Sequence, residues 1–271
     1  APTKPLPSYL LALAVGPYAV VDAGASRRGA PVRIIVPRGQ GADAAFAAAE
    51  TPKLLAALED YTGIPYPSDK LDQSVVPGAP RGARENAGLI TYAPKLLVIP
   101  PSESAATRRV ALEVIAHELA HQWFGNLVTM TWWDDLWLNE AFATWAEAWV
   151  LDAVHPELRG DALIAQDRRT ALAADGLASA RRIRQPVEDE AAIGAAFDGI
   201  TYQKGATVLH MFEQWLGPEV FRAGVRRYLD RFAWKTATAA DLMAALGEAA
   251  GRDVAAPMST FLDQAGAPMV T

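Results

Sequence analysis

The sequence predicts an α+β fold in which a β-rich N-terminal lobe precedes a mainly α-helical lobe. Two features carry this prediction. Short β-branched segments between glycines and prolines occupy the first hundred residues, and apolar residues at helical spacing dominate after Pro101. Hydrophobic residues make up 51% and charged residues 21% of the 271 positions, which excludes a disordered or collagen-like chain. We expect one domain over residues 1–271, with lobes at 1–101 and 102–271 and a cleft between them.

The N-terminal lobe is expected to contain short strands and one helix. The uncharged stretch from Tyr9 to Val21 is interrupted by Gly16-Pro17, which favours two strands joined by a turn over a signal-peptide core or a membrane span. A helix is expected from about Ala42 to Tyr61, ending near Gly63. Further strands are expected at residues 32–36, 74–76 and 89–92.

The C-terminal lobe is expected to be built from helices. A first helix should run from about Ser104 to Phe124, with Gly125 as its stop. Its apolar residues recur at helical spacing: Val110, Val114, Ala120 and Phe124. A second helix should open at Asp134-Asp135 and run to about Val154. Further helices are expected at 203–216, 218–232 and 239–250, the last with a capping box at Thr238 and Asp241.

The composition excludes several classes of partner and site. The net charge is −6, and the 25 Lys and Arg residues are spread along the chain, so no nucleic-acid partner is expected. The chain has no cysteine, which excludes disulfides and thiolate metal ligands. No segment reaches the roughly 20 apolar residues of a membrane-spanning helix, so no membrane segment is expected in this chain. We expect a soluble protein whose compartment the sequence does not specify.

The segment between Val114 and Gly125 contains the pattern H-E-x-x-H. His117 and His121 lie four residues apart, which on a helix places both rings on one face, about 6 Å apart along the axis. Both rings can then reach one Zn²⁺ at roughly 2.0–2.1 Å. Glu118 is rotated about 100° from His117, so it borders the metal and can act as a general base. Because the chain has only four histidines, an accidental match is rare.

A catalytic zinc needs a third protein ligand, and Glu140 is the candidate. Residues 122–139 lie between it and His121, enough for the chain to leave the first helix and return in a second one. Trp and Phe residues surround Glu140, which indicates a buried helix, and a buried carboxylate needs a cation partner. We expect one Zn²⁺ per chain, bound by His117, His121 and Glu140 with a fourth position open.

This arrangement, with Glu140 inside W-L-N-E-A-F-A, resembles the gluzincin aminopeptidases of the aminopeptidase N and leukotriene hydrolase type. Further segments resemble the same family and extend the likeness over nearly the whole chain: residues 61–67, 82–92, 197–205 and 261–268. The resemblance implies a thermolysin-like zinc peptidase domain, with the zinc site in its helical lobe and an edge strand on its cleft. It also implies a hydrolase, a zinc aminopeptidase that cleaves the N-terminal peptide bond of peptides with a free N-terminus. The attacking water would be activated by zinc, with Glu118 as general base.

The resemblance also implies roles for individual residues. Gly82, Ala83, Glu85 and Asn86 match the exopeptidase motif G-A-M-E-N and would bind substrate. Glu85 would hold the free α-amino group, and the backbone of Gly82 and Ala83 would pair with the substrate main chain. Tyr202 would donate a hydrogen bond to the oxyanion of the tetrahedral intermediate. Glu147 is either a partner of a ligating histidine or a plain surface residue.

Two departures from the family pattern bear on the function. Arg84 stands where the motif has Met, with Arg81 nearby, and either it folds back on Glu85 or it points away from the cleft. The flanking domains of the family are absent from this sequence, so the chain resembles an isolated catalytic domain. The alternative functions are a weak or inactive interaction module that keeps the fold, or a related zinc endopeptidase or epoxide hydrolase. The preferred N-terminal residue, the physiological substrate and the oligomeric state do not follow from the sequence.

Overall fold

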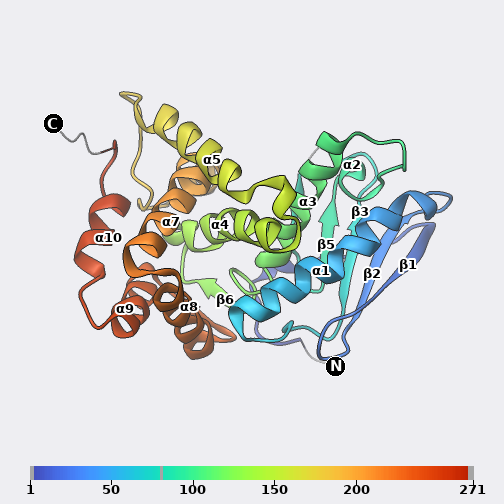
Figure 1. Ribbon diagram of the computed structural model, residues 1–271, viewed down its shortest axis with the longest axis horizontal. Helices are drawn as coiled ribbons and strands as arrows, with labels where there is room; N and C mark the ends of the chain where they lie inside the picture. Colours follow the sequence, from blue (N-terminus) through green and yellow to red (C-terminus); the bar gives the residue numbers. More distant parts are fainter. Residues whose placement is uncertain (1–2, 80–81, 268–271) are drawn as a thin grey trace.

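The computed structural model describes residues 3–79 and 82–267 (Figure 1), so Arg81 and Pro268 lie outside the described residues. The larger sheet has five strands in the order β1-β2-β3-β5-β4. Their bounds are β1 Tyr18–Ala25, β2 Pro31–Pro37, β3 Leu71–Val75, β4 Ala83–Arg84 and β5 Leu89–Tyr92. Strands β2, β3 and β5 are parallel, whereas β1 and β4 are antiparallel to their neighbours. The short strand β4 therefore forms one edge of this sheet.

One helix covers the sheet on the face seen in Figure 1. It is α1 (Ala45–Thr62), which follows a 3₁₀ turn, η2 (Ala42–Ala44), and ends at Gly63 in the left-handed conformation with φ 70°. Alternate residues of β2 are fully buried, namely Val32, Ile34 and Val36, and they share a hydrophobic core with the buried leucines of α1. This alternation is what a half-buried strand requires. The expected helix and the three expected strands at 32–36, 74–76 and 89–92 are thus present within a few residues of their predicted bounds.

The segment before Gly16 differs from its prediction. The expected first strand of a pair is wrong, because residues 11–15 are extended without a paired strand and follow a 3₁₀ turn, η1 (Ser8–Leu10). Leu11, Leu13 and Val15 are 66%, 88% and 83% exposed, so no layer among the described residues covers their apolar face. Only the second expected strand forms, as β1.

The rest of the described chain is mainly helical, which confirms the mixed α+β class. The helices are α2 Pro94–Leu97, α3 Ala105–Ala120, α4 Trp137–Val154, α5 Gly160–Asp175, α6 Glu190–Ala196, α7 Gly205–Leu216, α8 Pro218–Phe232, α9 Ala239–Ala250 and α10 Ala255–Leu262. Two 3₁₀ turns, η3 (Trp133–Asp135) and η4 (Pro156–Leu158), flank α4, and a π-helical turn, η5 (Ile200–Lys204), leads into α7. A short parallel pair, β6 (Val128–Met130) with β7 (Lys235–Ala237), was not predicted. The described residues include no helix long and apolar enough to cross a membrane.

The two central helices differ from their predictions in their ends and their buried faces. Helix α3 begins after Ser104, whose hydroxyl accepts the amide hydrogen of Thr107, and it ends at Ala120 because the next residues form a turn before Gly125 (φ 125°). Of the expected apolar stripe, Ala120 and Phe124 are buried and Val114 packs against the core, but Val110 is 50% exposed, so the prediction is wrong at that residue. The residues of α3 that are buried are Ala111, Leu112, Ile115, Ala116, Glu118, Leu119 and Ala120. Helix α4 begins at Trp137, after η3, rather than at the two aspartates.

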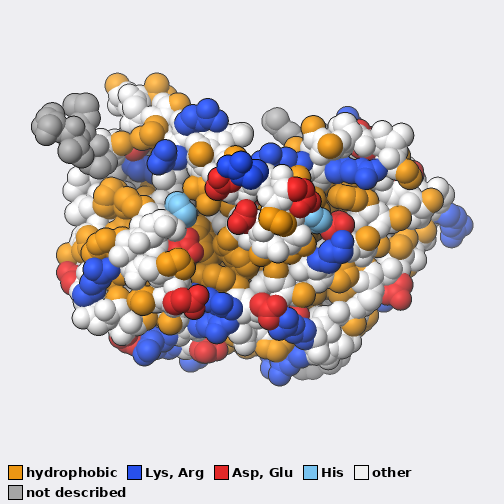
Figure 2. All heavy atoms as spheres, in the orientation of Figure 1, with side chains coloured by type: hydrophobic (Ala, Val, Ile, Leu, Met, Phe, Trp, Pro, Cys, Tyr) orange, Lys and Arg blue, Asp and Glu red, His pale blue; other side chains and the backbone are white. Residues whose placement is uncertain are grey.

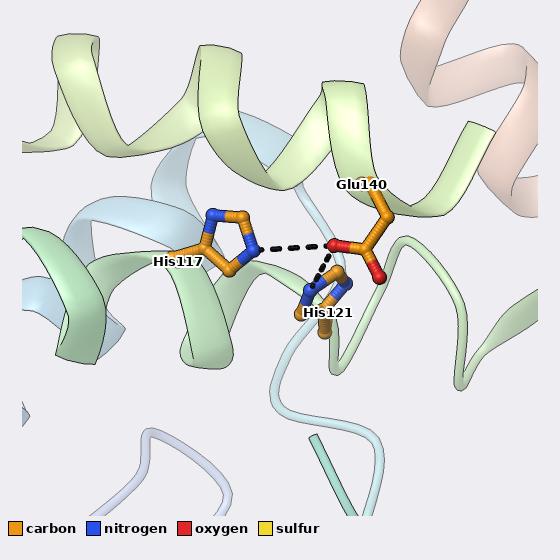
Figure 3. A group of neighbouring side chains, drawn as sticks. All are labelled: His117, His121 and Glu140. Carbon is orange, nitrogen blue, oxygen red and sulfur yellow. Dashed lines mark ion pairs between the residues drawn. The ribbon is translucent and has the colours of Figure 1, made fainter. Parts of the chain in front are cut away.

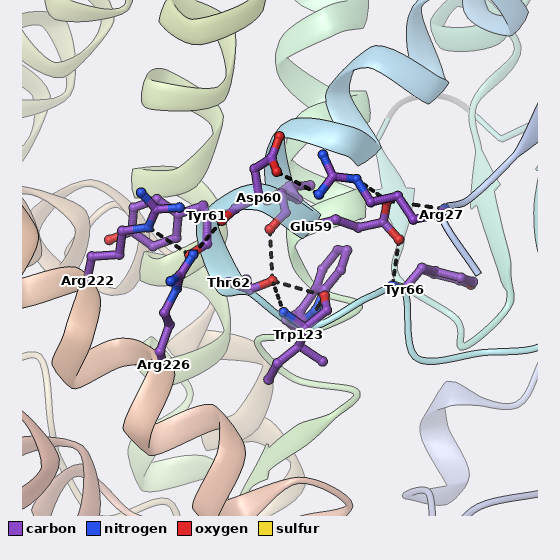
Figure 4. Close-up of polar contacts among 11 residues, drawn as sticks. Arg27, Glu59, Asp60, Tyr61, Thr62, Tyr66, Trp123, Arg222 and Arg226 are labelled. Atoms are coloured by element: carbon purple, nitrogen blue, oxygen red, sulfur yellow. Dashed lines mark hydrogen bonds and ion pairs between the residues drawn. The ribbon is translucent and has the colours of Figure 1, made fainter.

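The C-terminal end of α1 connects the sheet to the helices (Figure 4). Arg222 and Arg226 of α8 donate hydrogen bonds to the carbonyl oxygen of Tyr61 at 3.0 and 2.8 Å. Trp123, which follows α3, donates its indole hydrogen to the carbonyl oxygen of Ile64 at 3.0 Å. These bonds satisfy carbonyl groups that a helix end leaves unpaired. They also fix the chain around His121, two residues before Trp123, relative to the sheet.

The molecular surface carries both signs of charge. On the face drawn in Figure 2, acidic and basic side chains are interspersed and hydrophobic side chains lie between them. A surface of this kind has no large field of one sign on the face shown. The chemistry of the protein is therefore sought in a buried cluster of side chains rather than in a charged surface.

Candidate active site

Helices α3 and α4 bring His117, His121 and Glu140 together, as Figure 3 shows. The Nε2 atoms of the two histidines each lie 3.4 Å from Oε2 of Glu140. Their rings are nearly perpendicular, with centroids 4.7 Å apart. His121 is 1% exposed and Glu140 is 4% exposed. Among the described residues, these three form the group of histidine and acidic side chains that could hold a metal ion.

The geometry of this group fits a zinc ion. Two ligands bound tetrahedrally at about 2.0–2.1 Å are about 3.4 Å apart, which matches both nitrogen–oxygen distances. The Nδ1 atom of His121 lies 3.1 Å from the carbonyl oxygen of Phe124, which can only accept a hydrogen bond. Nδ1 therefore carries a hydrogen, and Nε2, on the side of Glu140, is the ring nitrogen that could ligate a metal. Two imidazoles and one carboxylate are the ligand set of many catalytic zinc sites.

A residue of α4 contacts the Nδ1 atom of each histidine, whereas the Nε2 atoms face Glu140. Glu147 Oε2 lies 3.2 Å from His117 Nδ1, so the first of the two interpretations of Glu147 is correct in its geometry. Asn139 Oδ1 lies 2.8 Å from His121 Nδ1. Although burial lowers the pKa values of both histidines, the neighbouring glutamates raise them above the usual range, and the same contacts lower the pKa of Glu140 against the effect of its burial. The cluster as a whole therefore favours a bound positive charge.

Glu118 lies beside the cluster without belonging to it. It is 6% exposed, and its Oε2 has no hydrogen-bond partner in the described part of the chain. Burial raises its pKa to about 7, partly offset by His121 and His117. A carboxylate with such a pKa can both accept and release a proton near neutral pH.

Tyr202 approaches the cluster from the π-helical turn η5. Its ring is nearly parallel to that of His117, with an interplanar angle of 12° and centroids 6.0 Å apart. Burial and then the charge of Glu140 raise its pKa, so the hydroxyl stays protonated as a hydrogen-bond donor. Single π-helical turns are frequent at functional sites because they change the direction of one side chain within a helix.

The predicted substrate-binding residues lie at the edge strand β4 and directly after it. Ala83 is part of β4 and pairs with Tyr92 of β5, while Gly82 precedes the strand with φ 80°. Glu85 follows β4, and the pKa values of Tyr202 and Glu118 both rise under the influence of its charge, which places it close to the cluster.

The two chain neighbours of Glu85, Arg84 and Asn86, form no described hydrogen bond or ion pair with its carboxylate. Arg84 is exposed, and no ion pair in residues 3–79 and 82–267 joins it to Glu85. Asn86 is 7% exposed and uses its amide on the framework, accepting from Thr91 Oγ1 at 3.1 Å and donating to the carbonyl oxygen of Tyr9. The direct contact of Asn86 with substrate stays a prediction.

Sequence reasoning missed four residues near the site. Asn139 precedes Glu140, and its amide contacts both His121 and Glu85. Gln122 and Asn126 donate to the backbone of Glu85. Tyr9 lies close enough to Glu85 and Glu140 for their charges to add to the effect of burial in raising its pKa. Only Asn139 carries a signal in the sequence, its place inside W-L-N-E.

Comparison with known proteins identifies the family of the chain. Residues 46–261 match the Peptidase family M1 domain. The chain is 39% identical to Aminopeptidase M1-A of Oryza sativa over 99% of its own length and 30% of that protein. It is 41% identical to Glutamyl aminopeptidase of Sus scrofa and 40% identical to mitochondrial Aminopeptidase 2 of Saccharomyces cerevisiae, over 98% and 99% of its length and 28% of each relative. The chain thus spans less than a third of the curated relatives it matches. The resemblance drawn from its motifs is confirmed, and the chain belongs to peptidase family M1.

Proposed function

We propose that residues 1–271 form the thermolysin-like catalytic domain of a zinc aminopeptidase, with a β-rich lobe at 1–101 and a helical lobe at 102–271. The observation that carries the proposal is the pair of 3.4 Å distances from Glu140 Oε2 to the two histidine Nε2 atoms. One zinc ion would be bound by His117, His121 and Glu140. When bound, zinc acts as a Lewis acid that polarises the scissile carbonyl and makes water more acidic.

Glu118 is the general base in this proposal. Its unpartnered oxygen and its pKa of about 7 suit a group that takes a proton from the attacking water and then gives it to the leaving amine. A cation bound beside Glu118 would lower this raised pKa and favour the ionised form that accepts a proton. Glu118 directly follows His117 on α3, so it can lie beside the metal without being one of its ligands.

Tyr202 and Glu85 complete the proposed chemistry. The Tyr202 hydroxyl, kept protonated by its surroundings, donates a hydrogen bond to the oxyanion that forms when water attacks. The Glu85 carboxylate binds the α-ammonium group of the substrate and so restricts cleavage to the first peptide bond. The edge strand β4, with Gly82 before it, offers backbone groups to an extended substrate chain.

The decisive experiment joins metal analysis to turnover. The purified chain should bind one equivalent of zinc, hydrolyse aminoacyl chromogenic substrates, lose activity with a chelator and regain it with zinc. Acetylated versions of the same substrates should be refused, because they lack the ammonium group that Glu85 binds. Metal content well below one per chain after zinc addition would contradict the metal site. Equal turnover of free and acetylated substrates would contradict the aminopeptidase assignment and favour an endopeptidase.

A further inference from the structure

Three amide side chains converge on Glu85 from the segments that carry the metal ligands. Asn139 Nδ2 donates to the carboxylate Oε1 of Glu85 at 3.2 Å. Gln122 Nε2 and Asn126 Nδ2 donate to its backbone carbonyl oxygen at 3.2 and 2.8 Å. All three are buried, with exposed fractions of 0%, 4% and 2%, so these bonds do not compete with bulk water.

The orientation of the Asn139 amide follows from its neighbours. Nδ1 of His121 carries a hydrogen, since it also faces the carbonyl oxygen of Phe124, and the atom of Asn139 at 2.8 Å from it must be the oxygen. The nitrogen of the same amide then faces Glu85, whose carboxylate can accept its hydrogen. One side chain thus satisfies a metal-ligand histidine and the amine-binding carboxylate at once.

The surroundings of Asn139 leave this side chain little freedom. A Cβ atom at Gly125 would lie 2.0 Å from Asn139 Oδ1, so the absence of a side chain at Gly125 is what makes room for the amide. Gly125 also has φ 125°, a conformation that side-chain-bearing residues rarely adopt. The turn after α3 therefore supplies both the hydrogen-bonded His121 and the space that Asn139 occupies.

A neutral amide is the donor that suits this position chemically. Lysine or arginine would also orient the Glu85 carboxylate, but either would neutralise it and compete with the ammonium group of a substrate. An amide fixes the direction of the carboxylate while leaving its charge available. No Lys or Arg in the described residues forms an ion pair with Glu85, which agrees with this interpretation.

We propose that Asn139 is a positioning residue that sets the orientation of Glu85 and of His121 together, so that recognition of the substrate amine depends on the metal centre through one side chain. The proposal rests on the proposed roles of Glu85 and of the zinc site. It predicts that substitution can separate the effect of the Asn139 amide oxygen on His121 from the effect of the amide nitrogen on Glu85. Asn139→Asp keeps an oxygen for His121 but replaces the donor to Glu85 by a second negative charge. Glu147→Gln is the matched control, because Glu147 contacts His117 and has no contact with Glu85.

The experiment measures zinc affinity by competition with a chelator and, on the zinc-loaded protein, the affinity for leucinamide and KM for an aminoacyl substrate. For Asn139→Asp we expect about tenfold weaker leucinamide binding, a similar rise in KM with a smaller change in kcat, and zinc affinity within about threefold of the wild type. For Glu147→Gln we expect zinc binding weakened by roughly tenfold or more, with leucinamide binding unchanged at saturating zinc. Melting temperatures close to wild type in both variants exclude a general folding defect.

A measurement that does not involve turnover tests the contact between the Asn139 amide oxygen and His121. In the zinc-loaded protein, ¹⁵N chemical shifts should report His121 with its hydrogen on Nδ1, and Asn139→Ala should shift the Nδ1 signal because it removes one of the two acceptors near that hydrogen. Leucinamide binding that is unchanged in Asn139→Asp would overturn the proposal, as would an equal loss in Asn139→Asp and Glu147→Gln. Wild-type protein that binds zinc but no leucinamide would instead overturn the proposed role of Glu85 itself.

Discussion

Asp72 in β3 and Glu140 in α4 are two carboxylates that are equally buried, at 5% and 4% exposed, but differently neutralised. Asp72 accepts from the Arg33 guanidinium at 2.6 and 2.9 Å and from Lys70 Nζ at 2.8 Å. Glu140 faces two imidazoles at 3.4 Å and, within residues 3–79 and 82–267, forms no ion pair with Lys or Arg. The carboxylate in the sheet carries its own counter-charge, whereas the one between the helices depends on a proton or a metal ion.

The difference separates an acid with a fixed ion-pair partner from the acid that we propose as a metal ligand. Burial raises the pKa of Asp72, but the hydrogen bonds and charges of Arg33 and Lys70 lower it overall. Within the described residues, no Lys or Arg forms an ion pair with Glu118 or Glu140. A buried negative charge without a fixed partner is costly unless an exchangeable cation offsets it. The acids at α3 and α4 therefore favour binding of an exchangeable cation, which the proposed zinc site would supply.

Glu118→Gln should have the largest effect, because it removes a buried charge that has no Lys or Arg partner in the described residues while conserving the shape of the side chain. Hydrolysis should fall by about 10⁴-fold, since the amide cannot accept a proton, while zinc remains bound. The free energy of unfolding should not decrease, because the buried carboxylate oxygen had no partner to lose. Single-turnover rates and metal content of the same preparation check both points. Loss of zinc together with activity would mean that Glu118 is a ligand.

The stabilisation of the chain by zinc should depend on only one of the two carboxylates, Glu140. At a free zinc concentration of about 1,000 times Kd, binding adds about 4 kcal/mol to the free energy of unfolding. Glu140→Gln should abolish this increment, and Arg33→Met, which affects the sheet carboxylate, should retain it. Urea titrations with zinc and with a chelator provide the measurement. An equal zinc effect in wild type and Glu140→Gln would place the metal elsewhere.

Tyr202→Phe tests a neutral donor in the same cluster. Its kcat should fall by roughly 10²–10³-fold with little change in KM, as for the loss of one hydrogen bond to an oxyanion. Zinc affinity should stay unchanged because the hydroxyl is not among the proposed ligands. Steady-state kinetics on two aminoacyl substrates would check this. A change confined to KM would show that Tyr202 binds the substrate before reaction.

Arg33→Met should affect stability in a pH-dependent way. The lowered pKa of Asp72 contributes stability that is present above the unfolded-state value of about 3.9 and is lost as the pH falls through the folded-state pKa. Because Arg33 is partly exposed and Lys70 remains, we expect a loss of about 1 kcal/mol at pH 7. The difference between variant and wild type should shrink below about pH 4. Urea denaturation at pH 7, 5 and 3 measures it, and a gap that widens with acidity would contradict the assignment.

Arg84→Met should have the smallest effect. Arg84 is exposed and makes no described ion pair with Glu85, so restoring the residue of the family motif should change KM by less than about twofold. Kinetics with a free-amine substrate at low and high salt would reveal any competition for Glu85. A marked fall in KM for the variant would mean that Arg84 partly neutralises Glu85, as Arg33 does for Asp72.

The grouping of His117, His121 and Glu140 and the main helices could be predicted from the sequence because their signals are local. A helical spacing of four residues brings His117 and His121 together, and the α4 pattern around Glu140 marks a buried helix. The family resemblance brought Tyr202 and Glu85 to the same site. The contacts of Asn139 could not be predicted in this way, because Glu85 lies 54 positions earlier in the chain and the contact arises only when sheet and helices pack.

The errors in the predicted fold have a similar origin. Residues 9–15 form a short uncharged apolar run of the kind a strand can have, but a strand also needs a paired neighbour, which composition cannot supply. The apolar residue Val110 fits a helical period, yet neighbouring elements cover the face that contains Ala111 and Ile115 instead. Strands β6 and β7 were missed because three-residue strands that pair across more than a hundred positions leave no local pattern.

The π-helical turn before α7 makes the site sensitive to chain length. Gly205 seats α7 against α4 so closely that a Cβ atom there would lie 2.6 Å from Cβ of Ala141. Since α7 is anchored at this point, deletion of Gln203 would shorten the turn from its N-terminal side and rotate Tyr202 by about 100° about the helix axis, away from His117. A one-residue deletion would thus remove the phenol from the site while every side chain assigned a chemical role stayed in the sequence. Natural or engineered length changes at 200–204 therefore offer a route to silence the domain that no substitution scan would detect.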